Sequence, residues 1–128
     1  MQKLNQSYIK SVIKKALDED IKPRGDITTK LIKFKNKKVK AQIIAKQNGV
    51  ISGLDFCKTA FKLVGKETVF VSKVKDGSKV KKNKAIAEIK AKTKTILIAE
   101  RTALNFLNHA SGISTLTNLF VQKVKKKN

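Results

Sequence analysis

The residue of this 128-residue chain with the clearest chemical potential is Arg101. The chain contains 28 lysines and only two arginines, so an arginine here indicates a need for the guanidinium group itself. Arg101 lies near the start of a predicted helix, where a cation opposes the helix dipole. Its planar fork can bind a carboxylate through two parallel hydrogen bonds, which lysine cannot do. Two interpretations stay open: a carboxylate-binding residue, or an arginine that pairs with Glu100 or packs in an interface.

The other reactive side chains favour structural roles. His109 is the only histidine, and because no neighbouring ligand could share a metal with it, we expect it in the core or an interface. Cys57 falls on an apolar helical stripe, which predicts a small buried side chain. Four acids share one short stretch: Asp18, Glu19, Asp20 and Asp26. Because lysines flank it, this stretch is typical of a solvated turn or a helix end, and we expect no metal site.

The charge balance limits the classes of partner. Thirty basic residues against nine acidic ones give a net charge of +21 and a pI of about 10.3. Such a charge attracts anions and is a first sign of nucleic-acid binding. Base recognition and stacking, however, depend on arginine and aromatic side chains, which are scarce here, and the lysines are scattered. We therefore do not expect a dedicated nucleic-acid-binding function.

The sequence also predicts a cytoplasmic protein with no membrane partner. No apolar run approaches the roughly 18–20 residues that a membrane-spanning helix needs. Residues 1–15 are amphipathic and lack the compact apolar block of a signal peptide. A single cysteine excludes an internal disulfide framework.

Hydrophobic periodicity predicts the first helices and the strands. A helix over residues 7–19 has Ser7 as its N-cap, and a second over 54–64 is followed by Gly65 as its C′ residue. Short strands are predicted at residues 39–45, 50–52, 68–74, 85–91 and 93–98, and residues 50–52 could equally form a bend. Gly53 borders the second of these, at a place where the backbone is expected to approach another element closely.

The last part of the chain is predicted to be helical. Apolar residues recur at helical spacing from 99 to 124, with a break at Ser111-Gly112. The order of elements predicts an α+β fold. We divide the chain into an N-terminal α+β domain over residues 1–110 and a helix over residues 111–128.

Several segments of the chain together resemble one family. They are Ala16-Leu17-Asp18-Glu19-Asp20, Gly25-Asp26-Ile27-Thr28-Thr29, Gly49-Val50-Ile51-Ser52-Gly53, Asp76-Gly77 with Val80, Glu100-Arg101-Thr102-Ala103-Leu104-Asn105-Phe106-Leu107, and Ser111-Gly112-Ile113-Ser114-Thr115. Their order and spacing resemble quinolinate phosphoribosyltransferase, also called carboxylating nicotinate-nucleotide pyrophosphorylase. A related pyrophosphorylase-like protein linked to molybdenum transport shares much of the pattern. That protein and a small basic nucleic-acid-binding module stay as alternatives.

The resemblance implies a fold, a reaction and a role for Arg101. The fold is an open-faced, mainly antiparallel sheet with helices on one side, ending in helices that lead into an α/β barrel absent from this chain. The reaction joins quinolinate to phosphoribosyl pyrophosphate with Mg²⁺, and yields nicotinate mononucleotide, pyrophosphate and carbon dioxide in de novo NAD synthesis. Family members are homodimers or larger, in which this domain covers the neighbouring subunit's barrel. Arg101 matches the arginine that binds a quinolinate carboxylate across the dimer interface.

The chain ends where the barrel of the family would begin. The family's other substrate-binding groups lie in that barrel, including a Thr-Arg-Lys segment and a His-Arg pair. The resemblance therefore implies a domain with no catalytic residue of its own. We expect this chain to be inactive alone and to bind no Mg²⁺ by itself.

Overall fold

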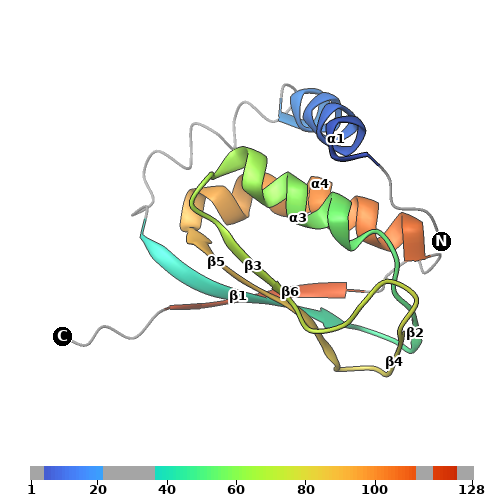
Figure 1. The fold of residues 1–128 in the computed structure, drawn as a ribbon. Coiled ribbons are helices and arrows are strands. Elements are labelled where there is room, and N and C mark those ends of the chain that lie inside the picture. The colour runs from blue at the N-terminus through green and yellow to red at the C-terminus, as the bar shows by residue number, and fades with distance from the viewer. Residues whose placement is uncertain (1–4, 22–36, 112–116, 124–128) are drawn as a thin grey trace.

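The computed structural model describes residues 5–21, 37–111 and 117–123, which form three helices and six strands (Figure 1). The helices are α1 (Gln6–Ile21), α3 (Leu54–Val64) and α4 (Thr93–Ser111). The strands are β1 (Lys38–Ala45), β2 (Gly49–Val50), β3 (Val69–Ser72), β4 (Lys79–Val80), β5 (Ala85–Lys92) and β6 (Thr117–Lys123). The fold class is α+β, as the sequence predicts.

Four of the strands form one antiparallel sheet in the order β3-β5-β1-β6. The central pair, β1 and β5, is in continuous register until a bulge after Ile43. The strands β2 and β4 form a separate two-stranded ribbon. Because side chains alternate between the faces of a strand, every second residue of β1 enters the core. These buried residues are Val39, Ala41, Ile43 and Ala45.

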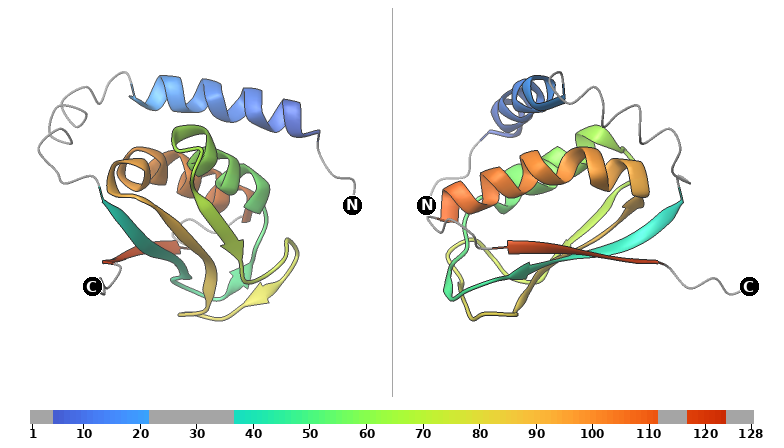
Figure 2. Two further views of the ribbon diagram at one scale, coloured as in Figure 1. Left: turned by 60° about the vertical axis from the view of Figure 1, so that its left-hand side comes forward. Right: turned by 180° about the vertical axis from the view of Figure 1, so that it is seen from behind.

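The helices lie on one face of this sheet, as the two views of Figure 2 show. Helices α3 and α4 pack side by side against the sheet, and α1 lies across their outer side, in contact with both. No described helix covers the other face, on which Val69 and Val71 of β3 are 50% and 43% exposed. The open-faced sheet implied by the resemblance is therefore confirmed.

The core lies between the sheet and the helices. Its largest fully buried side chain is Phe61 of α3, whose ring contacts that of Phe70 on β3 at 6.4 Å between centroids. Helix α1 adds a buried stripe of Ile9, Ile13 and Leu17, spaced four residues apart. This spacing places the three side chains on one helix face, which docks α1 onto the α3–α4 pair.

The strand predicted at residues 93–98 is wrong, because these residues form the first turns of α4. Thr93, Thr95 and Ile98 are β-branched, which favours a strand locally. The buried side chains of α4, however, recur every three or four residues: Ile96, Ala99, Ala103 and Leu107. Burial of this stripe against the core outweighs the local preference.

The helix predicted beyond Ser111 is also wrong where the structure describes it. Residues 117–123 form β6, which pairs with β1 from Ala45 opposite Thr117 to Val39 opposite Lys123. A short apolar run cannot be assigned to a helix or a strand by periodicity alone, and pairing here satisfies the backbone groups along one edge of β1. The domain boundary between residues 110 and 111 stays a prediction.

Two helix ends, the N-terminus of α1 and the C-terminus of α3, test the capping residues predicted from the sequence. The first N-cap is Asn5 rather than Ser7, because the Asn5 carboxamide oxygen accepts a 2.7 Å hydrogen bond from the Ser7 N–H. Gly65 follows α3 directly, but as the C-cap residue in an extended conformation rather than at C′, and donates its N–H to Phe61 O. A Cβ atom at Gly65 would lie 2.6 Å from Thr95 Oγ1, so glycine is needed there for close packing on α4.

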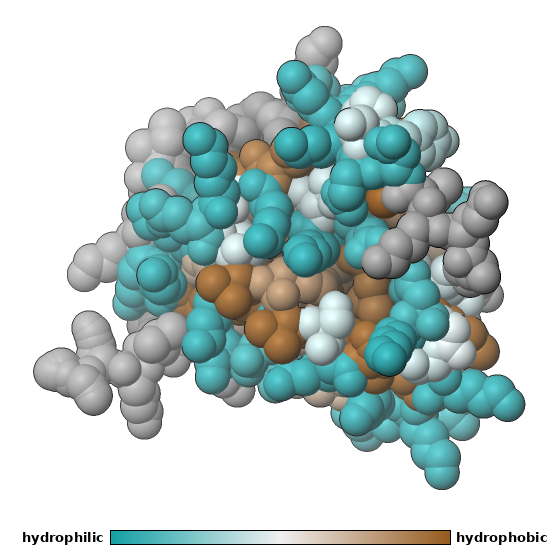
Figure 3. All heavy atoms as spheres, in the orientation of Figure 1, coloured by the Kyte–Doolittle hydropathy of each residue, from teal (hydrophilic) through white to brown (hydrophobic). Residues whose placement is uncertain are grey.

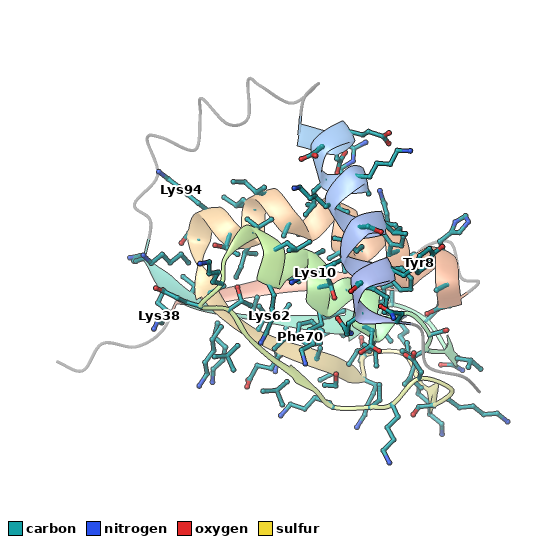
Figure 4. All side chains as sticks on the ribbon, turned by 45° about the horizontal axis from the view of Figure 1, so that its top comes forward. Tyr8, Lys10, Lys38, Lys62, Phe70 and Lys94 are labelled. Atoms are coloured by element: carbon teal, nitrogen blue, oxygen red, sulfur yellow. The ribbon has the colours of Figure 1, made fainter. Side chains whose placement is uncertain are left out.

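Charged and polar side chains cover most of the face shown in Figure 3. The lysines labelled in Figure 4 come from four different elements: Lys10 from α1, Lys38 from β1, Lys62 from α3 and Lys94 from α4. The positive charge is therefore spread over the described part of the chain. Among the described residues, no helix has both the length and the apolar character to cross a membrane.

Candidate functional site

Arg101 lies in the middle of α4 and reaches solvent. It is the ninth residue of a helix that begins at Thr93, so the expectation that it sits near a helix start is wrong, and the argument from the helix dipole does not apply. Its side chain is 60% exposed, which leaves the guanidinium accessible from outside the domain. What remains of the sequence argument is that Arg101 is one of only two arginines among 30 basic residues.

One carboxylate stands beside this guanidinium. Asp20 of α1 places Oδ1 3.6 Å from Arg101 Nε, and its Oδ2 accepts a 2.8 Å hydrogen bond from the Thr102 hydroxyl. The Nε–Oδ1 distance is that of an ion pair and is too long for a good hydrogen bond. Within the described part of the chain, the guanidinium therefore keeps its N–H donors for a further acceptor. The interpretation of Arg101 as an ion-paired residue is thus correct in kind, but the partner shown is Asp20.

Asp20 lines a hollow between α1 and α4. This hollow has a volume of about 240 Å³ and is lined by Ala16, Glu19, Asp20, Thr102, Asn105 and Phe106. Thr102 is 3% exposed and forms its floor, whereas Glu19 and Asn105 are exposed at its rim. The hollow thus combines amide, hydroxyl and carboxylate groups next to the arginine.

A polar stripe continues from Arg101 along α4. Asn105 and His109 follow at intervals of four residues, and all three side chains are exposed. Because four residues complete about one helical turn, they share one face of the helix. The expectation that His109 lies in the core is wrong, and its place in an interface stays a prediction.

Two other family-like segments hold the C-terminal end of α4. The Ser111 hydroxyl oxygen accepts a 3.0 Å hydrogen bond from the Ser52 N–H and donates one of 3.1 Å to Ser52 O. Gly53 has φ +90°, and a Cβ atom there would lie 2.8 Å from Ala110 Cβ. The close approach predicted beside this glycine is therefore confirmed. Ser111 fixes the end of α4 against the segment that follows β2.

The Asp76-Gly77 turn supports the same region. Asp76 Oδ1 accepts a 3.2 Å hydrogen bond from the Leu54 N–H, at the N-terminus of α3. Gly77 adopts φ +92° and donates its N–H to Ile51 O at 2.7 Å. Ile51 in turn donates its N–H to Ser78 O at 2.9 Å. These hydrogen bonds connect the turn to residues 51–54, the segment that packs against the end of α4. The position of Arg101 on α4 therefore depends on residues far from it in sequence.

Cys57 is completely buried on α3, and desolvation raises the pKa of its thiol. This confirms its predicted role as a small apolar side chain. Asp18 and Glu19 are exposed, whereas Asp20 is half-buried; Asp26 lies outside the described residues. Within the described ranges, no three His, Cys, Asp or Glu side chains gather into a group that could hold a metal ion.

Sequence reasoning missed the pairing of Asp20 with Arg101 and Thr102. The two segments lie about 80 residues apart, since the Thr102–Asp20 bond spans 82 positions. One signal was available: Asp20 and Arg101 both fall within segments that carry the family resemblance. Helical periodicity alone does not show which faces of α1 and α4 meet.

Known proteins match the chain over most of its length. Residues 26–111 match the family described as "Quinolinate phosphoribosyl transferase, N-terminal domain". A "Probable nicotinate-nucleotide pyrophosphorylase (carboxylating)" of Methanocaldococcus jannaschii is 39% identical over 124 residues, which are 96% of this chain and 42% of the relative. "Quinolinate phosphoribosyltransferase (decarboxylating) 1b" of Nicotiana tabacum is 35% identical over 85% of this chain and 31% of its own.

Solved structures agree with these relatives. NadC from Streptococcus pyogenes superposes with a TM-score of 0.76 at 33% identity, over 88% of this chain and 40% of its own. The nicotinate-nucleotide pyrophosphorylase from Francisella tularensis gives a TM-score of 0.74 at 30% identity, over 83% and 37% of the two chains.

The fold and the matched residues define an N-terminal domain of the phosphoribosyltransferase type. This chain belongs to the quinolinate phosphoribosyltransferase family. It spans less than half the length of these relatives, 42% and 31% of the archaeal and tobacco proteins.

Proposed function

We propose that this chain is the substrate-covering and dimerisation domain of a quinolinate phosphoribosyltransferase. In this proposal Arg101 binds a carboxylate of quinolinate that is held in the barrel of a neighbouring subunit. The complete homo-oligomer converts quinolinate and phosphoribosyl pyrophosphate to nicotinate mononucleotide, pyrophosphate and carbon dioxide. The enzyme acts in the cytoplasm in de novo NAD synthesis.

The observation that carries the proposal is the exposure of Arg101 in a chain of this family. Its side chain is 60% exposed, and its single ion pair within the described residues, at 3.6 Å, does not occupy its hydrogen-bond donors. An arginine held in this way can still form a bidentate contact with a carboxylate. The net charge of +21 also favours the approach of a dianionic substrate and of a polyphosphate.

The remaining chemistry belongs outside the described residues. The described side chains do not form a set that fits Mg²⁺, so in this proposal the ion enters with phosphoribosyl pyrophosphate at the barrel. The part played by this domain is to bind one carboxylate and to exclude water from the reacting centre, which strengthens the charge contacts there. The isolated chain should accordingly show no turnover of the two substrates.

A complete enzyme tests the proposal. This chain can replace the matching N-terminal part of the Methanocaldococcus jannaschii relative, to which it is 39% identical. Arg101→Ala should raise the KM for quinolinate roughly ten- to a hundredfold, because a charged bidentate contact is worth about 1.5–3 kcal/mol. Arg101→Lys should restore binding only in part, since it lacks the fork. Lys62→Ala removes the same charge from α3 and should leave the KM unchanged; an unchanged KM in Arg101→Ala would refute the proposal.

A further inference from the structure

Asp20 and Thr102 form a chain of contacts that ends at Arg101. Thr102 is almost fully buried, with 3% exposure, and its hydroxyl is bonded to Asp20 Oδ2 at 2.8 Å. A buried donor of this kind fixes the orientation of the carboxylate, because the hydroxyl has no solvent to turn to. The second oxygen of Asp20 then faces Arg101 Nε at 3.6 Å.

Among the residues that the structure describes, no group takes a hydrogen bond from the terminal nitrogens of the guanidinium. A carboxylate that sequestered the arginine would take two parallel hydrogen bonds from it. The ion pair joins Asp20 Oδ1 to Nε at 3.6 Å, which is too long for a good hydrogen bond. It can therefore restrict the side chain's rotamers without competing for the two terminal nitrogens, which are the donors that a ligand approaching from solvent would meet.

We infer that Asp20 is a positioning residue for Arg101, and that Thr102 in turn positions Asp20. This inference rests on the proposed carboxylate-binding role of Arg101 and names the residue that prepares it. A long exposed side chain loses rotamer entropy when it is fixed by a ligand. An ion pair that already restricts it reduces that loss, so Asp20 increases the affinity of the domain for the substrate carboxylate.

The composition of the chain makes a direct test possible. Labelling of arginine alone with ¹⁵N gives two Nε–Hε signals, from Arg24 and Arg101, which Arg24→Lys distinguishes. In Asp20→Asn, which can still accept the Thr102 hydroxyl, Hε of Arg101 should exchange with solvent about two- to fivefold faster, as expected on loss of a largely exposed ion pair. Asp20→Glu should restore part of the protection. Glu19→Gln removes the neighbouring carboxylate at the same hollow and should change nothing.

Equal exchange rates at Arg101 in wild type, Asp20→Asn and Glu19→Gln would overturn the inference. In the complete enzyme described above, Asp20→Asn should raise the KM for quinolinate about two- to fivefold with kcat retained. A lower KM would show that Asp20 competes with the substrate, which also contradicts the inference. If Arg101→Ala leaves the KM unchanged, the proposed function fails, whereas the exchange rates still decide whether Asp20 positions the side chain.

Discussion

Substitution of Gly53 gives the sharpest test of its close packing against Ala110 and Phe106 of α4. Its φ of +90° is a left-handed conformation, and a Cβ atom there would lie 2.8 Å from Ala110 Cβ and 3.4 Å from Phe106 O. Gly53→Ala should therefore carry two penalties. The left-handed backbone costs an L-residue about 1–2 kcal/mol, and overpacking typically costs about 1–3 kcal/mol. The smaller entropy of the unfolded alanine chain offsets about 0.4–1 kcal/mol.

The expected loss in the free energy of unfolding is therefore about 2–4 kcal/mol, measured by urea denaturation of the 128-residue chain. Gly77→Ala is the matched control, because Gly77 has φ +92° and no atom within 4 Å of the added Cβ. That variant should lose only about 0.5–1.5 kcal/mol. Adding Ala110→Gly to Gly53→Ala removes the clash, so the two changes should be less destabilising together than the sum of their separate effects. Equal losses in Gly53→Ala and Gly77→Ala would refute the close packing of this segment on α4.

Two further predictions concern the described core and the end of α4. Burial raises the pKa of the Cys57 thiol and shields it from reagents. At pH 8 the folded chain should therefore react with a disulfide reagent at least tenfold more slowly than the chain unfolded in urea. Equal rates would contradict the burial of Cys57. Ser111→Ala leaves the Ser52 N–H without its hydrogen-bond acceptor and should lower the free energy of unfolding by about 1–3 kcal/mol. The control is Ser11→Ala at an exposed site of α1, which should change the free energy of unfolding by less than about 0.5 kcal/mol. Both losses are measured by urea denaturation, and similar values for the two serine variants would show that the contact with Ser52 contributes little.

The sequence predicts secondary structure best where the spacing of apolar residues and the residues that end an element indicate the same boundary. Helix α3 was predicted at its observed bounds, since its apolar stripe ends at a glycine. Residues 93–98 and 117–123 were assigned wrongly because their β-branched and apolar residues satisfy more than one period. In each case the outcome depends on a distant partner: the core for α4, and the edge of β1 for β6.

The candidate site was predictable in part for a similar reason. The rarity of arginine in this chain is enough to indicate Arg101 as a candidate functional residue. The surroundings of Arg101 were not predictable, since Asp20 reaches it only after α1 has docked across α3 and α4. The sequence predicts the acidic stretch as a solvated turn or a helix end, and Asp18, Glu19 and Asp20 do lie at the end of α1. It does not show that one of these carboxylates pairs with the arginine.

Three residues from the segments that carry the family resemblance constrain the position of α4 in this structure. The segment around Gly53 lets α4 approach closely, Ser111 bonds it there, and Asp76 caps α3 beside it. None of the three touches Arg101, yet each constrains the helix on which Arg101 stands. A shift of about 1 Å in a binding group is enough to weaken a substrate contact severely. If Arg101 binds quinolinate as proposed, substitutions at these three positions in the complete enzyme should raise the KM for quinolinate through the placement of α4, even where the domain remains folded.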